Sequence, residues 1–289
     1  MDQSSHDTAA TIAAADRLRQ AAETSTPCAP VRDLIGADDL AAAYAVQARN
    51  IEARITDGAT VVGRKIGLTS PAVQAQLGVD QPDFGWLLDD MDLTGVEEVP
   101  MSRLLQPKAE AEVAFVLADD LAEGPLDEAQ VRAAVAYAVA ALEIVDSRVA
   151  GWDIRFGDTV ADNASSGLYV LGSQRRTLDD VEPVEVEMSM SVDGEVVSTG
   201  NGAACLGDPL AAMVWLARTA REHGAPLRAG QVVLSGALGP MYDVHPGATV
   251  TAEISGLGTV TARFSNDTFS NDTVSKHTAP NGAVPEEDQ

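Results

Sequence analysis

The sequence contains only two cysteines, Cys28 and Cys205, which lie far apart and form no metal-binding motif. A disulfide framework is therefore excluded, and the two thiols are interpreted as reduced. The sequence also has no apolar run of 18 residues, and its first 20 residues lack a basic end followed by an apolar core. Neither a membrane span nor a secretory signal is expected, and we predict a cytoplasmic protein.

Basic residues are scarce, with 19 Lys and Arg against 44 Asp and Glu and a net charge of -25. Such an acidic surface repels nucleic acids and anionic membranes, so neither is expected as a partner. The chain also lacks a P-loop, an HExxH zinc site and a GxSxG nucleophile elbow, and its four histidines form no cluster. What the chain does have is a small set of acidic side chains in apolar surroundings.

The order of the expected elements predicts an α+β fold without regular βαβ winding. Helices are expected over 8–25 and 37–55, and the chain is rich in predicted strands from about residue 155. Between these parts we expect a short helix over 72–79, an irregular loop over 80–91, and a long helix from 127 that gives way to a strand at about 142–146. The predicted organisation is a helical segment over 1–60, a catalytic domain over 61–264 and a disordered acidic tail over 265–289.

A predicted strand within PKAEAEVAFVLADDL places Glu110 and Glu112 on the same face, about 7 Å apart by strand geometry. Two like charges on a mostly apolar strand repel each other unless a cation or water lies between them. Glu143, in LEIVD, is a third acid with apolar neighbours. Three carboxylates suit a hard divalent ion such as Mg²⁺ or Mn²⁺ rather than zinc. Solvated glutamates on a strand surface are the alternative.

Lys65, in VVGRKIGLTS, shares a predicted strand face with Gly63 and Gly67, which leave space above its side chain. An apolar setting would lower the pKa of this lysine toward the range useful for acid/base catalysis. A lysine that extends to solvent is the alternative interpretation.

Six segments, in order and at plausible spacing between about residues 30 and 264, together resemble the 2-keto-4-pentenoate hydratases of the fumarylacetoacetate hydrolase-like superfamily. They are GRKIGLTSPAVQAQLGVDQPDFGWLLDDM, PKAEAEVAFVL, ALEIVDSR, DTVADNASSG, GDPLAAMVWLA and SGALGPM. The resemblance implies a highly curved mixed β-sheet roll of the fumarylacetoacetate hydrolase C-terminal type, preceded by a helical segment. It also implies a homo-oligomer in the degradation of aromatic compounds, with the downstream aldolase as a further partner to expect.

By the same resemblance, Glu110, Glu112 and Glu143 would hold Mg²⁺ or Mn²⁺, and Lys65 and Asp83 would transfer protons. The implied substrate is 2-hydroxypenta-2,4-dienoate, which is hydrated to a 4-hydroxy-2-oxo acid. Arg148 would hold the substrate carboxylate or a neighbouring acid, and Ser165 would lie near the substrate. A turn or cap position is the alternative for Asp83, and a structural loop network is the alternative for Asp162 and Asn163.

Three rival functions remain at this point. The 2-oxo-3-hexenedioate (4-oxalocrotonate) decarboxylases of the family share the metal site and the lysine, but they tend to have an apolar residue in place of Asp83, so Asp83 favours a hydratase. A hydratase for a dicarboxylate chain would need an extra cation for the far carboxylate. A non-catalytic acidic metal-binding oligomer would not need the whole set. The segment YDVHPG, with Tyr242, Asp243 and His245, departs from the family pattern, so the substituent preference can differ.

Overall fold

The computed structural model describes residues 8–70, 74, 79 and 81–267. The predicted tail beyond residue 267 and most of the predicted helix over 72–79 lie outside these residues. Within the described ranges, no helix combines the length and the hydropathy needed to cross a membrane.

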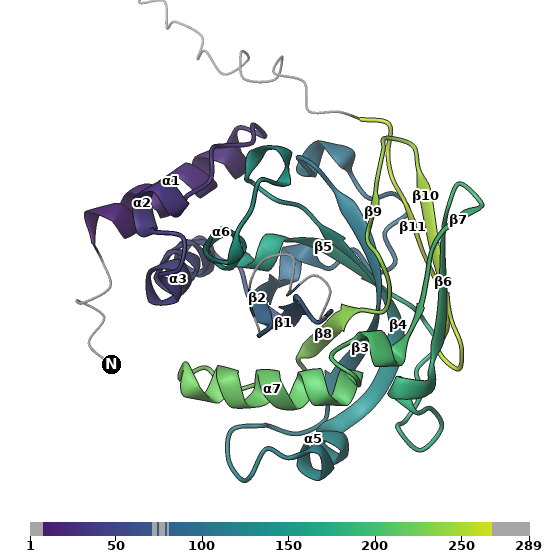
Figure 1. The fold of residues 1–289 in the computed structure, drawn as a ribbon. Coiled ribbons are helices and arrows are strands. Elements are labelled where there is room, and N and C mark those ends of the chain that lie inside the picture. The colour runs from purple at the N-terminus through teal and green to yellow at the C-terminus, as the bar shows by residue number, and fades with distance from the viewer. Residues whose placement is uncertain (1–7, 71–73, 75–78, 80, 268–289) are drawn as a thin grey trace, which may run out of the picture.

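Three helices, α1 (Ala9–Glu23), α2 (Arg32–Ile35) and α3 (Leu40–Thr56), begin the chain and lie at one side of the molecule (Figure 1). The two predicted helices are confirmed with slightly different ends. Asp39 caps α3, since its carboxylate accepts a hydrogen bond of 3.0 Å from the amide of Ala42. α3 packs against α1 and against α6 (Phe156–Ala161), a helix that the sequence did not predict.

The large sheet has seven strands, of which six follow the order β2-β1-β8-β3-β4-β5 and the seventh, β9, pairs with β3. Only β1 and β8 are parallel, so the sheet is mixed, as predicted. Its strands are β1 (Val61–Gly67), β2 (Asp83–Leu88), β3 (Lys108–Leu117), β4 (Val135–Val145), β5 (Ser166–Leu171), β8 (Val232–Ala237) and β9 (Tyr242–Asp243).

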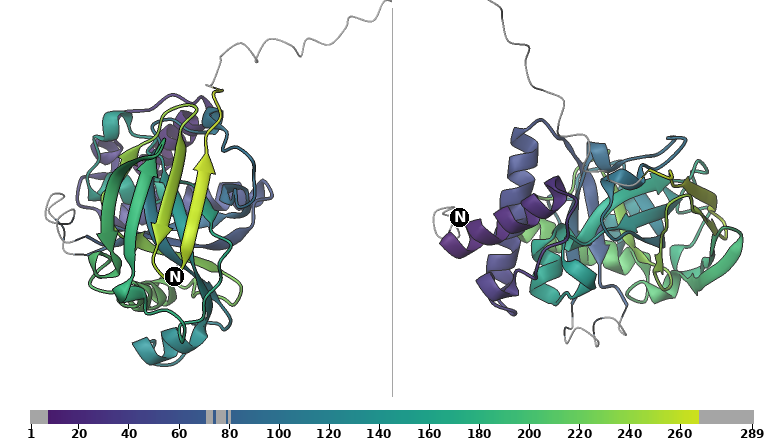
Figure 2. Two further views of the ribbon diagram at one scale, coloured as in Figure 1. Left: turned by 90° about the vertical axis from the view of Figure 1, so that its right-hand side faces the viewer. Right: turned by 90° about the horizontal axis from the view of Figure 1, so that it is seen from above.

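A second, four-stranded sheet in the order β11-β10-β6-β7 contacts β4 and β5 at the side away from α1 to α3 (Figure 2). Its strands are β6 (Glu187–Val192), β7 (Glu195–Asn201), β10 (Thr249–Ile254) and β11 (Gly258–Arg263). β6 and β7 are joined by a tight hairpin turn at Asp193-Gly194, where both residues have positive φ, 52° and 83°, as a two-residue type I′ turn requires. The main core lies between the two sheets, and helix α7 (Pro209–Glu222) contacts β8 and β1 of the large sheet.

Two sequence-based expectations were wrong. The helix predicted from residue 127 ends as α5 (Glu128–Ala134), and the strand begins at Val135 rather than near Leu142. Ala138, Ala140 and Ala141 favour a helix intrinsically, but their buried pairing against β3 and β5 outweighs that preference. The predicted loop over 80–91 contains β2, because the segment pairs antiparallel with β1.

Candidate metal centre

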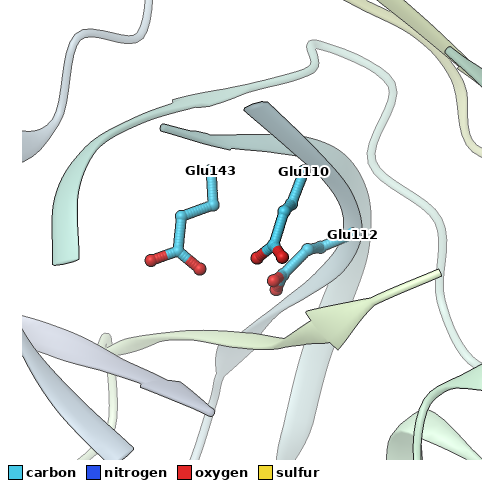
Figure 3. A group of neighbouring side chains, drawn as sticks. All are labelled: Glu110, Glu112 and Glu143. Atoms are coloured by element: carbon cyan, nitrogen blue, oxygen red, sulfur yellow. The ribbon is translucent and has the colours of Figure 1, made fainter. Parts of the chain in front are cut away.

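Three glutamates converge where β3 and β4 run side by side. Glu110 and Glu112 are two residues apart on β3 and therefore share a face, and Glu143 on β4 lies directly opposite Glu110 in the antiparallel register. Each offers a carboxylate oxygen, and the three oxygens lie within 4.8 Å of one another. Figure 3 shows the three carboxylates pointing into the same space.

The carboxylates have few hydrogen-bond donors around them. Glu112 Oε2 accepts a bond of 2.8 Å from the backbone amide of Gly236. Glu112 Oε1 and Glu143 Oε2 are buried and receive no hydrogen bond from the described part of the chain. Burial raises the pKa of all three carboxyl groups, that of Glu110 to about 7, and the charges of neighbouring glutamates add to the rise for Glu110 and Glu112.

This donor set fits a hard divalent cation. Buried carboxylate oxygens without donors are energetically unfavourable by themselves, and oxygen ligands of this kind are those that Mg²⁺, Mn²⁺ and Ca²⁺ prefer. No histidine or cysteine belongs to the cluster, so its chemistry does not favour zinc.

Lys65 lies beside the carboxylates on β1 and is 3% exposed. Its Nζ is 3.2 Å from Glu143 Oε1 and donates a hydrogen bond of 2.9 Å to the carbonyl oxygen of Ala164. Burial alone lowers the pKa of this amine, but the four carboxylates around it together outweigh burial and raise its pKa above the ordinary value. The expectation of a lowered lysine pKa was therefore wrong, because the surroundings are buried but anionic.

Asp83, the first residue of β2, is 1% exposed and lies across the β1–β2 ladder from Gly67. Its Oδ2 accepts a hydrogen bond of 3.3 Å from Thr159 Oγ1, while its Oδ1 has no donor in the described residues. Burial raises the pKa of this carboxyl group. A Cβ at Gly67 would lie 2.2 Å from Asp83 Oδ1 and 3.5 Å from Lys65 Nζ, so glycine keeps the space between the two groups open.

A cavity of about 680 Å³ connects these groups. Lys65, Asp83, Glu110 and Ser165 all line it, and Glu112 and Glu143 are buried next to Glu110. The structure therefore brings together six of the seven predicted site residues.

The seventh, Arg148, lies apart from this cavity and lines a different one, between α1, α3 and the large sheet. Its guanidinium donates to Asp162 Oδ1 and to the carbonyl oxygens of Asp146 and Ser166. Of the two predicted roles, the structure shows a contact with an acid, and the bonds to carbonyl oxygens tie together the loop that carries Ser165.

That loop, Asn163–Ser165, has three consecutive residues in the left-handed region, with φ between 51° and 55°. Asn163 fixes it to β2, because its side chain exchanges hydrogen bonds of 2.8 and 2.9 Å with the backbone of Trp86. The structural alternative predicted for Asn163 is thus the geometry observed. The loop presents the Ala164 carbonyl to Lys65 and places Ser165 Oγ 3.4 Å from Thr159 Oγ1.

Sequence reasoning missed Thr159 and Lys108 as parts of the site. Thr159 lies on α6, in a segment that was not predicted to be helical. The contact between Lys65 and Ala164 is made by a backbone carbonyl oxygen, which the identity of the side chain does not reveal. Gly67 was expected to leave space above Lys65, and the structure places this glycine beside Asp83 as well as Lys65.

Residues 60–265 match the family model described as "Fumarylacetoacetate (FAA) hydrolase C-terminal". The chain is 55% identical to a 2-keto-4-pentenoate hydratase from Burkholderia vietnamiensis strain G4, over 87% of this chain and 96% of the relative. It is 53% identical to a TodF product hydratase from Pseudomonas putida F1, over 89% and 96% of the two chains.

A solved structure of 4-oxalocrotonate decarboxylase from Pseudomonas putida G7, complexed with magnesium and adipate, has a similar fold. The TM-score is 0.83 at 34% identity, and the match covers 88% of this chain and 97% of the other. The likeness of fold therefore extends to a decarboxylase, whereas the relatives with more than half of their residues identical are hydratases.

Proposed function

The chain belongs to the fumarylacetoacetate hydrolase C-terminal family, and from this premise we propose that it is a hydro-lyase that adds water to 2-hydroxypenta-2,4-dienoate to give 4-hydroxy-2-oxopentanoate. The observation that carries the proposal is the convergence, beside one cavity, of three carboxylates and a Lys65–Asp83 pair. The hydratase relatives, at 55% and 53% identity over nearly their whole length, support the choice of reaction.

Glu110, Glu112 and Glu143 would hold the divalent cation, for which we propose Mg²⁺ or Mn²⁺. When bound, the ion supplies Lewis-acid polarisation of the 2-oxygen and orients the substrate carboxylate. The remaining work is proton transfer: the 2-hydroxyl loses a proton, C5 gains one, and water adds its oxygen to C4 and a proton to C3.

Asp83 is suited to carry these protons. Its Oδ1 has no hydrogen-bond donor in the described residues and faces the space that Gly67 leaves open. Burial raises the pKa of this carboxyl group, which brings proton uptake closer to neutral pH.

Lys65 has a different task. The carboxylates around it raise its pKa and hold it as a cation, so it acts as a charged hydrogen-bond donor that stabilises negative charge on the substrate oxygens. Ser165, on the cavity wall, would contact the substrate. Arg148 would act as a positioning residue, through Asp162 and the loop carbonyl oxygens that it binds.

The test is to follow the ultraviolet absorbance of freshly generated 2-hydroxypenta-2,4-dienoate. The absorbance should fall with Mg²⁺ or Mn²⁺ present, stop falling on addition of a chelator and resume when the ion is restored. Glu110→Gln should lose this activity, whereas Glu195→Gln, at an exposed acid that begins β7, should keep it. Unchanged absorbance with every metal would refute the hydratase, and CO₂ release from 2-oxo-3-hexenedioate would identify a decarboxylase instead.

A homo-oligomer, a cytoplasmic location and association with the downstream aldolase stay predictions. Light scattering on the purified chain tests the first, and co-purification with the aldolase tests the last.

A further inference from the structure

Lys108 lies on the same face of β3 as the candidate metal ligands Glu110 and Glu112, two residues before Glu110. It lines the same cavity, as Trp152 does. Its ammonium is 5.5 Å from the centre of the Trp152 ring, and Trp152 is fixed by a hydrogen bond of 3.0 Å from Nε1 to the carbonyl oxygen of Gln106. Lys108 therefore stands at the outer end of the space that begins at the glutamates.

The ammonium of Lys108 is already paired. Nζ is 2.6 Å from Asp243 Oδ1, and the two residues face each other in the β3–β9 register. The lysine side chain is 21% exposed and the aspartate 82% exposed, so Asp243 reaches the lysine from the solvent side. Asp243 does not line the cavity itself.

Among the described residues that line the cavity, Lys65 and Lys108 are the only two cations. Lys65 is held by Glu143 and the Ala164 carbonyl at the inner end. The cavity wall also includes the apolar side chains of Val145, Ile154 and Leu238. A second carboxylate on a ligand would lose water beside Lys108 and would have to compete with Asp243 for the positive charge of that lysine.

We propose that Asp243 is a specificity-determining residue: by neutralising Lys108 it restricts the site to 2-oxo acids with an uncharged far end and disfavours dicarboxylates. The inference rests on the proposed function, since it assumes that a 2-oxo acid binds with its carboxylate toward the glutamates. Asp243 lies in the segment YDVHPG, and its neighbour His245 pairs elsewhere, with Asp193 at 3.1 Å.

The experiment compares equilibrium binding of two probes to the Mg²⁺-loaded protein by calorimetry. 2-Oxopentanoate has an uncharged far end, and 2-oxohexanedioate has the same 2-oxo acid head with a second carboxylate. In the wild-type protein the monocarboxylate should bind more tightly. Asp243→Asn should improve dicarboxylate binding about tenfold relative to the monocarboxylate, the scale of one charge-assisted hydrogen bond at a partly exposed site.

Two controls separate this effect from a general change of charge. Asp33→Asn removes the same charge from an ion pair of 2.7 Å with Arg17 in the helical segment and should leave the ratio of the two affinities unchanged. The double variant Asp243→Asn with Lys108→Gln should return the ratio to the wild-type value, because the freed cation is gone. An unchanged ratio in Asp243→Asn, or an equal gain in the double variant, would overturn the proposal.

Failure of the proposed function gives a different result. If neither 2-oxo acid binds to the Mg²⁺-loaded protein, or if both bind equally with and without the ion, the assumed binding mode is wrong and the specificity proposal falls with it. If both bind only with the ion but Asp243→Asn leaves their ratio unchanged, the function stands and Asp243 has no part in selectivity.

Discussion

Two clusters of buried charge lie next to each other along β4 and the loop that follows it, and they are built in opposite ways. In the first, Glu143 meets Glu110 and Glu112 beside the buried Lys65, and several carboxylate oxygens receive no hydrogen bond from the described residues. In the second, only a few residues further on, Arg148 donates to Asp162 and to backbone carbonyl oxygens.

In the second cluster, each acid accepts several hydrogen bonds. Asp162 also accepts hydrogen bonds from Ser147 Oγ, at 3.1 Å, and from the amide of Arg148, at 2.9 Å. Asp146 accepts from the amides of Leu105 and Gln106. Burial raises the pKa of the acids in both clusters, so the direction of the pKa shift does not separate them. The number of hydrogen bonds does separate the two clusters. A buried acid that accepts all its hydrogen bonds supports the fold, whereas a buried acid that lacks donors indicates a ligand site.

The largest effect should come from breaking the complete cluster. Asp162→Asn leaves the half-buried Arg148 guanidinium without its buried anion, and losing one partner of a buried pair costs up to about 3–5 kcal/mol of unfolding free energy. Urea unfolding of the metal-free protein measures this loss. Divalent-ion affinity of the folded fraction should stay near the wild-type value, and a loss of ion binding without a loss of stability would mean that Asp162 belongs to the metal site.

The matched change in the incomplete cluster should do the reverse. Glu143→Gln removes a candidate metal ligand. Mutation of residues that hydrogen-bond to a metal ligand already lowers metal affinity by about 10- to 100-fold, so removal of the ligand itself should lower it by more than about 100-fold. The metal-free variant should be at least as stable as the wild type, since one of three repelling carboxylates is gone. Titration with Mn²⁺ measures the metal affinity, and urea unfolding measures the stability. A marked loss of stability would mean that Glu143 supports the fold, as the acids of the second cluster do.

The pH dependence of stability should also distinguish the incomplete cluster, by a smaller amount. Burial raises the pKa of Glu110 from 4.5 to about 7, so its protonated form is favoured in the folded state. That contribution to stability is complete below about pH 4.5 and is lost as the pH rises through about 7.

Without metal, Glu110→Gln should therefore melt close to the wild type at pH 5 and above it at pH 8. Saturating Mg²⁺ should reverse the order at pH 8, because the ion binds the charged carboxylate of the wild type. If the variant and the wild type melt at equal temperatures at both pH values, Glu110 is not one of the mutually repelling acids of the first cluster.

The residues of the first cluster could be predicted from the sequence better than their arrangement in space. Glu110 and Glu112 share a strand face by the two-residue period alone, so their proximity was predictable from local geometry. That Glu143 lies opposite Glu110 depends on the β3–β4 register, which is set by packing over many residues. The error at residues 135–141 has the same origin, since alanines that favour a helix were placed in a strand by buried partners.

The second cluster was harder to predict, because its most important contacts go to the backbone. Arg148 was expected to meet a substrate carboxylate or an acid, and the carbonyl oxygens of Asp146 and Ser166 that receive its protons carry no sequence signature. The proposed roles of the site residues stay predictions.

The smallest of these effects should appear at Thr159, which gives Asp83 a single hydrogen bond of 3.3 Å within the otherwise incomplete site. Thr159→Val keeps the shape and removes the donor, so we expect kcat to fall by up to about tenfold, the worth of one neutral hydrogen bond, with ion affinity unchanged. Because this bond lowers the pKa of Asp83, its loss should shift the limb of the pH–rate profile that reports Asp83 to higher pH. Thr261→Val, which removes a hydroxyl from an exposed Thr251–Thr261 pair between β10 and β11, is the matched control and should change neither quantity. A lower kcat with an unshifted profile would mean that Thr159 acts through packing, and Asp83 would then belong with the charges that support the fold.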